Sequence, residues 1–145
     1  MTKEIQLRQI KNNTFIAKAD SGHWVAMDTK KEAGGSGSAS TPKELLLMAL
    51  AGCTSMDVIP ILKKKRSPVL NYECYVKGVE ADELPKIFTA IHIEYVFYGD
   101  GIKPEDVEHA IELSTTKYCA VSAQLSASAA ITHSFRIEPA SKLLG

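Results

Sequence analysis

The sequence predicts one α+β domain spanning residues 1–145. Three observations predict it: the length suits one domain, several short segments alternate apolar and polar residues, and the run Leu45–Ala51 is apolar on every side of a helix. Read along the chain, the expected order is three strands, a long helix, two strands, two helices and a final strand. Strands and helices that are grouped in this way are typical of an α+β fold.

The composition excludes several classes of protein. Lys and Arg total 17, Asp and Glu also total 17, and 45% of the residues are hydrophobic, which is typical of a globular chain rather than a disordered one. This charge balance gives no field to recruit nucleic acid or an anionic membrane, so neither is expected as a partner. No apolar run is expected to be long enough to span a bilayer, and Met1–Ile10 has no signal-peptide core. We therefore expect a cytoplasmic protein.

The first element is a three-stranded meander. Its strands are expected at residues 4–10, 14–19 and 23–28. The turns between them, Lys11–Asn13 and Asp20–Gly22, contain the residue types that tolerate the positive φ of tight hairpins.

Residues 30–40 are rich in Gly and Ser and are expected to be flexible, either as a connector or as a mobile lid beside a site. The segment carries the first two glycines of a dinucleotide-binding fingerprint, but Ser40 replaces the third and no Gly-Lys-Ser/Thr follows. We therefore do not expect a nucleotide site.

A long helix follows. Thr41 can cap it, Pro42 suits its first position, and Glu44 can complete a capping box. Because the run Leu45–Ala51 is apolar all round, we expect the helix to be buried on most of its circumference. It should continue to Leu62 with a kink at Pro60, and the basic residues 63–66 that follow should be solvated.

The second half of the chain alternates clearly. In residues 69–78 and 88–98 one face is apolar and the other polar, which predicts half-buried antiparallel strands. Pro104 opens a helix with a narrow core stripe at Val107, Ala110, Ile111 and Ser114. We expect a break near Tyr118, a short helix over residues 120–128 and a last strand over 131–138.

The three cysteines lie too far apart for a zinc motif and are too few for a disulfide scaffold. Cys74 shares the apolar face of its strand and reads as a core thiol. Cys53, in mid-helix, is either a packed thiol or a reactive one that needs a cation from elsewhere. Cys119 precedes a helix, whose free amides favour a thiolate, although a partly buried cap residue is the alternative.

The histidines are weaker signals. His92 and His109 are expected at the surface, and His133, on an apolar face, is expected as a hydrogen-bonded core residue. His23 lies in a turn and receives no role.

Two segments carry a family resemblance. Residues 40–57, STPKELLLMALAGCTSMD, and residues 117–122, KYCAVS, resemble the two cysteine motifs of the OsmC/Ohr family, and most closely its OsmC-like branch. This resemblance implies antiparallel sheets wrapped around long central helices in an intertwined homodimer. It would also explain why the Leu45–Ala51 run is apolar all round.

The resemblance further implies a thiol peroxidase that reduces organic hydroperoxides in oxidative-stress resistance. Cys53 would attack the peroxide and become a sulfenic acid, and Cys119 would resolve it to a disulfide. A dithiol reductant would then restore both thiols. Neither a cofactor nor a metal is implied.

The sequence departs from the peroxidase branches at two positions. Their arginine aligns with Asp20 and their glutamate with Lys43, while Glu44 is already assigned to the capping box. His23, Lys18 or a basic residue of a partner chain are open substitutes for the activating pair. The alternative function is a non-catalytic dimer that binds a small apolar ligand at its interface.

Overall fold

A computed structural model describes residues 1–144, and the chain forms two compact units, Met1–Leu46 and Leu47–Gly145. The order of elements agrees with the sequence prediction, and the α+β class is confirmed. Whether both units make a single domain stays a prediction.

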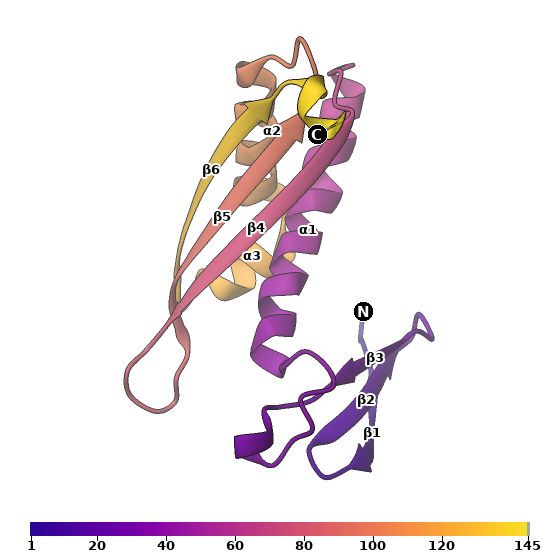
Figure 1. Cartoon of the computed structure of the whole chain (residues 1–145). Helices are drawn as coiled ribbons and strands as arrows, with labels where there is room; N and C mark the ends of the chain where they lie inside the picture. Colours follow the sequence, from indigo (N-terminus) through magenta and orange to yellow (C-terminus); the bar gives the residue numbers. More distant parts are fainter. Residues whose placement is uncertain (145) are drawn as a thin grey trace. The chain divides into compact units, whose positions relative to one another are not determined.

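The N-terminal unit contains one antiparallel sheet of three strands, β1 (Ile5–Lys11), β2 (Thr14–Ala19) and β3 (Trp24–Met27), with β2 in the centre (Figure 1). Its hairpin turns contain Asn12 at φ 51° and Gly22 at φ 80°. These positive angles confirm the expected reason for Asn and Gly in the two turns.

The Gly-Ser segment wraps around the buried carboxylate of Asp28. That carboxylate accepts hydrogen bonds from the amides of Thr29, Ser36 and Ser38 and from the hydroxyls of Thr14 and Ser38. A Cβ at Gly35 would lie 2.1 Å from the Thr29 carbonyl oxygen, so only glycine fits there.

Asp28 also explains why this loop is no phosphate cradle. Its carboxylate occupies the amides that an anionic ligand would need. The Ser38 hydroxyl, with the amides of Thr29, Ser36 and Ser38, holds the pKa of Asp28 well below its usual range. The segment connects β3 to α1, as one of the two readings expected, but Asp28, a residue outside the Gly-Ser stretch, holds part of it in place.

The C-terminal unit is built on a second three-stranded sheet, in the order β4 (Asn71–Glu80), β5 (Phe88–Tyr98) and β6 (Ala130–Glu138). The helices α1 (Pro42–Lys64), α2 (Pro104–Leu113) and α3 (Ala120–Leu125) lie on one face of this sheet (Figure 1). Antiparallel strands were expected, and β4 does run antiparallel to β5, but β6 runs parallel to it. The reason is the connection between β5 and β6, which crosses the sheet through α2 and α3 and returns the chain to the same end.

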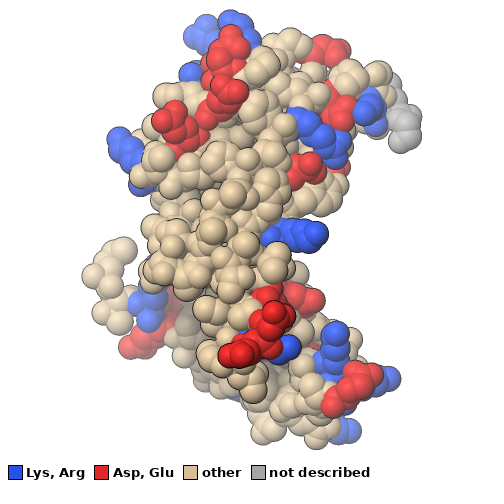
Figure 2. Space-filling view, turned by 90° about the vertical axis from the view of Figure 1, so that its left-hand side faces the viewer, with Lys and Arg blue, Asp and Glu red and all other residues tan. Residues whose placement is uncertain are grey.

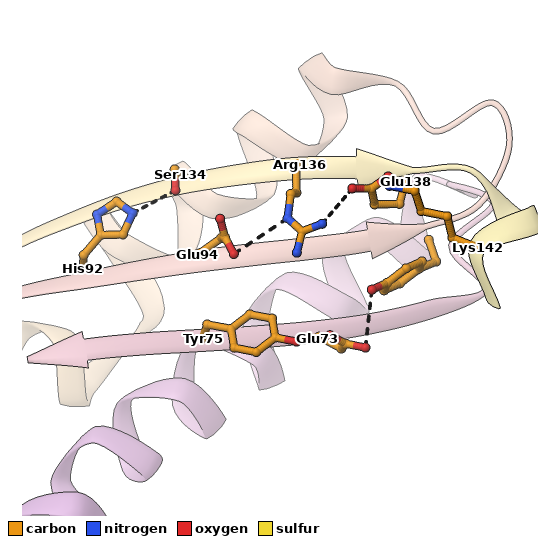
Figure 3. Close-up of polar contacts among 9 residues, drawn as sticks. Glu73, Tyr75, His92, Glu94, Ser134, Arg136, Glu138 and Lys142 are labelled. Carbon is orange, nitrogen blue, oxygen red and sulfur yellow. Dashed lines mark hydrogen bonds and ion pairs between the residues drawn. The ribbon is translucent and has the colours of Figure 1, made fainter. Parts of the chain in front are cut away.

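The other face of this sheet is polar (Figure 3). The two ring nitrogens of His92 each lie 2.8 Å from a hydroxyl, of Thr132 and of Ser134. The guanidinium of Arg136 lies 3.7 Å from Glu94 and 2.7 Å from Glu138. The His92 and Glu94 pairings join β5 to β6, and the Arg136–Glu138 pair lies within β6.

The long helix α1 begins with the predicted capping box. The Thr41 amide donates to Glu44 Oε2 at 2.8 Å, and the Glu44 amide donates to Thr41 Oγ1 at 3.2 Å. The helix continues without a break through Pro60 to Lys64.

Only one stripe of α1 is buried in the single chain: Leu50, Thr54, Val58 and Leu62, each one turn after the last. Met48 and Met56 are 53% and 78% exposed. Burial on most of the circumference is therefore not seen in one chain, because one sheet can cover only one side of a helix.

By length and composition alone α1 is long and apolar enough to cross a membrane, a test that the core helix of a soluble protein also passes. The expectation that no run reaches that length is wrong, because the small residues that interrupt the apolar run, such as Gly52 and Thr54, are uncharged.

The core of this unit follows the predicted alternation in β5. Ile91, Ile93, Tyr95 and Phe97 all point toward the helices and are almost fully buried. They pack with the buried stripe of α1 and with Val107 and Ile111 of α2. The inner face of β5 thus fixes where α1 lies, and α1 carries Cys53.

Candidate functional site

Cys53 and Cys119, far apart in the sequence, are neighbours in the C-terminal unit. The two side chains lie close enough for Cys53 to raise the pKa of the Cys119 thiol, and neither thiol is in a disulfide. Cys53 lies on α1 and is half-buried, whereas Cys119 precedes α3 and is only 3% exposed. The structure therefore brings together the two cysteines that the family resemblance pairs.

A turn of π-helix, Ser114–Tyr118, places Cys119. The Cys119 amide donates to the Ser114 carbonyl at 2.8 Å, and Cys119 caps α3 because its Sγ accepts from the Ser122 amide at 3.4 Å. The predicted break and restart of the helix at this residue is confirmed. The π turn has no sequence pattern that could have predicted it, although such turns recur at functional sites.

Burial raises the pKa of the Cys119 thiol to about 11. The Ser122 amide lowers the pKa, but the contact with Cys53 and the negative charge of Asp57 raise it further. Of the two readings left open for Cys119, the structure agrees with the buried cap residue, because Cys119 caps α3 and is almost fully buried. Desolvation, which raises the pKa, outweighs the Ser122 amide, which lowers it.

A chain of hydroxyls ends beside these thiols. Thr54 Oγ1 lies 2.7 Å from the Tyr95 hydroxyl and 2.9 Å from Ser114 Oγ, and Ser114 Oγ donates to Asp57 Oδ2 at 2.9 Å. Each hydroxyl has one hydrogen, so donation to the carboxylate fixes the direction from Tyr95 through Thr54 and Ser114 to Asp57. Asp57 lies one helical turn after Cys53.

Sequence reasoning assigned Thr54, Tyr95 and Ser114 to no site. Two of these residues could have been noticed, because each places a hydroxyl at a predicted core position: Tyr95 on the inner face of its strand and Ser114 on the core stripe of its helix. Buried hydroxyls need partners, so such positions point to a network. Which groups join it depends on tertiary contacts.

Cys74 lies at a separate cluster on β4. Tyr72 and Ser55 lie near its thiol and lower its pKa, and the Tyr72 hydroxyl lies 2.8 Å from Ser55 Oγ. Burial raises the pKa of Cys74, and the side chain packs against the core. The prediction of a core-facing thiol is confirmed.

Two hollows lie in this region, and Cys119 lines one of them. One of about 270 Å³ is lined by Met56, Asp57, Pro60, Ile61, Lys64 and Tyr118. Another of about 200 Å³ lies beside Cys119 and is lined by residues 115–120 and Ala123. Cys53 lines neither hollow, and both linings mix polar and apolar side chains. In the part of the chain that the structure describes, no group of three or more His, Cys, Asp or Glu is placed to hold a metal ion.

The residues aligned with the usual activating pair lie in the N-terminal unit. Asp20 is exposed in the turn before β3, and Lys43 lies in the first turn of α1. His23 and Lys18 were the residues of this chain that could replace the activating pair. His23 is exposed, and the Lys18 ammonium makes a cation–π contact, 5.1 Å from the centre of the Trp24 ring.

His133 is exposed, so the prediction of a core histidine is wrong. His133 lies on the face of β6 that the helices cover, but β6 is an edge strand. A hollow of about 310 Å³, lined by His133 and by Glu108 and Ile111 of α2, leaves the imidazole open to solvent. His92 and His109 lie at the surface as expected.

Residues 35–134 match the model of the family described as OsmC-like protein. The chain belongs to the OsmC-like family. It is 34% identical over 135 residues to Protein YhfA of Escherichia coli K12, which covers 92% of this chain and 97% of that relative.

Solved structures of other proteins have the same fold as this chain. A hypothetical protein from Aquifex aeolicus VF5 is 32% identical with a TM-score of 0.83, over 96% of this chain and 98% of that one. An organic hydroperoxide resistance protein OsmC from Legionella pneumophila shares the fold, with a TM-score of 0.69 and 14% identity over 93% and 96% of the two chains.

Proposed function

We propose that this OsmC-like protein is a cysteine-based thiol peroxidase that reduces organic hydroperoxides in oxidative-stress resistance. The observation that carries the proposal is that the fold brings the side chains of Cys53 and Cys119 close together, 66 residues apart in the sequence. The name of the Legionella pneumophila neighbour, which shares the fold, supports the same substrate class.

The reaction divides between the two thiols. The Cys53 thiolate attacks the terminal oxygen of the hydroperoxide, an S–O bond forms, the O–O bond breaks, and the alkoxide takes a proton and leaves as the alcohol. Cys119 then attacks the Cys53 sulfenic acid, the disulfide forms and water leaves. A dithiol reduces the disulfide by exchange and becomes a disulfide itself.

This assignment fits the exposure of the two sulfurs. Cys53 is half-buried and so can meet a substrate, whereas Cys119 is buried and keeps its proton. A thiol that attacks a substrate must be accessible to it, and Cys53 is the more accessible of the two sulfurs.

A homodimer is part of the proposal. The uncovered side of α1 carries Met48 and Met56, and a soluble monomer rarely exposes so apolar a helix face. A second copy covering this face would bury the residues that a single sheet leaves open.

The proposed location is the cytoplasm, and no nucleic-acid partner is proposed. Three free thiols suit a reducing compartment. On the face seen in Figure 2, Lys and Arg lie beside Asp and Glu rather than in one basic patch. Cell fractionation that finds the protein in the periplasm would contradict the location.

The direct test is consumption of hydroperoxide in the presence of a dithiol. Cumene hydroperoxide should be consumed catalytically and faster than hydrogen peroxide, and Cys53→Ser should abolish the reaction. Cys74→Ser is the matched control and should retain it. Turnover that persists in Cys53→Ser, or none in the unaltered protein, would contradict the proposal.

The second candidate is a dimer that binds a small apolar ligand without turnover. The observation that favours it is the pair of departures at Asp20 and Lys43, where the peroxidase branches carry their activating residues. Saturable binding of an apolar fluorescent probe, with no hydroperoxide consumption and slow oxidation of Cys53, would favour this candidate.

A further inference from the structure

Ser114 connects the two segments that carry the paired cysteines. It begins the π turn that directly precedes Cys119, and its carbonyl accepts from the Cys119 amide at 2.8 Å. Its side chain reaches the other segment, because Ser114 Oγ donates to Asp57 Oδ2 at 2.9 Å and lies 2.9 Å from Thr54 Oγ1, both on α1. Thr54 directly follows Cys53 in the sequence, and Asp57 lies one helical turn after it. One residue thus joins the backbone around both thiols.

We infer that Ser114 is a positioning residue that anchors the turn before Cys119 to α1, and so holds Cys119 within reach of Cys53 for disulfide formation. This inference rests on the peroxidase function proposed above and says what brings the resolving thiol to the site.

The other hydroxyls of this turn hold it to its own helix. Thr115 Oγ1 donates to the Ile111 carbonyl at 3.0 Å, and Thr116 Oγ1 donates to the Glu112 carbonyl at 2.7 Å, both in α2. Among the residues that the structure describes, Ser114 is the member of the turn that hydrogen-bonds to α1. Loss of its hydroxyl would therefore leave the turn held to α1 by packing alone.

Burial makes this connection stiff. Ser114, Thr54 and Tyr95 are each 1% exposed or less, so water cannot replace their hydrogen bonds. Ser114 uses its one hydrogen on Asp57 and accepts from Thr54, which accepts from the Tyr95 hydroxyl at 2.7 Å. Because Tyr95 lies on β5, the chain of hydroxyls ties the turn, α1 and the sheet together, and its members depend on one another.

The position of Cys119 matters for the step after Cys53 is oxidised. The Cys119 sulfur attacks the sulfenic sulfur of Cys53, an S–S bond forms, and the departing hydroxide leaves as water with the Cys119 proton. The bond closes only when the two Cα atoms lie about 4.4–6.8 Å apart. Two groups on one chain react at an effective concentration that depends on how closely they are held together. The anchor at Ser114 raises this effective concentration.

The test measures the equilibrium between thiols and disulfide without any hydroperoxide. In a Cys74→Ser background the protein is equilibrated with mixtures of glutathione and glutathione disulfide, which takes two electrons from the pair and becomes two glutathione thiols as the Cys53–Cys119 bond forms. Alkylation and mass spectrometry give the oxidised fraction. Ser114→Ala should lower the equilibrium constant for the disulfide about threefold or more, because it lowers the effective concentration of the two thiols.

Ser126→Ala is the matched control, because it makes the same chemical change in the same unit. The Ser126 hydroxyl is exposed and donates to the Ala123 carbonyl at 3.0 Å, within its own turn. The equilibrium constant should therefore stay unchanged. A constant for Ser114→Ala equal to that of Ser126→Ala would overturn the inference.

Thr54 supplies a second, independent pair of variants. Thr54→Val keeps the shape of the side chain but removes the hydroxyl, so it should lower the constant. Thr54→Ser removes a buried methyl group but keeps the hydroxyl, so it should restore most of the constant, although urea denaturation should show a loss of stability. Thr54→Val also serves if Ser114→Ala fails to fold, which circular dichroism would show. Equal constants for the two Thr54 variants would contradict the anchor.

The two proposals fail separately. A lowered constant for Ser114→Ala in a protein that does not consume hydroperoxide overturns the peroxidase function and leaves the role of Ser114 standing. An unchanged constant in an active peroxidase overturns the role of Ser114 alone. An unaltered protein that forms no Cys53–Cys119 disulfide overturns both.

Discussion

At the scale of single residues, the thiol pair is asymmetric. Cys119 is buried and protonated, while Cys53 is more open, and the difference follows from where the two elements place the sulfurs rather than from the residue types. A cysteine at a helix N-terminus is normally a candidate thiolate. Here the loss of water outweighs the amides, and this could not be predicted without knowing the burial.

The raised pKa of Cys119 predicts a pH dependence for disulfide formation. Its thiolate is scarce below a pKa of about 11, so under excess hydroperoxide the step after Cys53 oxidation should accelerate with pH. The expected rise is about tenfold per unit from pH 7 to 9, because the thiolate fraction rises by that factor. Acid quenching followed by alkylation measures it. A rate that does not change with pH would contradict the assignment.

Asp28 gives a second prediction at this scale. Its depressed pKa means that it stabilises the folded state above the pKa of an unfolded aspartate, and that this contribution falls as acid protonates the folded carboxyl. Asp28→Asn should therefore release the 30–40 loop, seen as severalfold faster proteolysis there at neutral pH. Asp20→Asn, in an exposed turn, should leave cleavage unchanged; equal cleavage of both variants would contradict the account.

At the scale of elements, α1 has one buried and one open side. Leu50→Ala removes a fully buried side chain and should lower the free energy of unfolding by about 2–5 kcal/mol. Leu84→Ala makes the same chemical change at a position that is 86% exposed, and it should cost far less. Urea denaturation of both variants measures the difference, and similar losses would show that the burial of α1 is wrongly described.

Alternation and caps predicted most elements because they depend on near neighbours. The capping box of Thr41 and Glu44, the inner face of β5 and the break at Cys119 all follow from spacing within a few residues. The parallel pairing of β6 and the order of the 30–40 loop did not, since each depends on a distant segment. The family resemblance paired Cys53 with Cys119. The hydrogen bond between Ser114 and Asp57 also joins distant segments, and no motif in the sequence predicts it.

At the scale of the whole molecule, the open side of α1 predicts a tight homodimer, in the class that buries about 2,000 Å² or more. Met56→Asp places a charge on that side and should shift the protein toward monomer or insolubility, whereas Leu84→Asp, at an exposed position in the loop before β5, should not. Sedimentation velocity at micromolar concentration distinguishes these outcomes. An unaltered protein that sediments as a stable monomer would contradict the dimer.

The central claim is that Cys53 and Cys119 form one redox pair, and peptide mapping after oxidation tests it most directly. The reduced protein is treated with one equivalent of cumene hydroperoxide, and the remaining thiols are alkylated before digestion. The account predicts a single Cys53–Cys119 disulfide with Cys74 reduced, and a sulfenic acid trapped on Cys53 in Cys119→Ser. Slow oxidation of all three cysteines at similar rates, or a Cys53 that stays reduced, would contradict it.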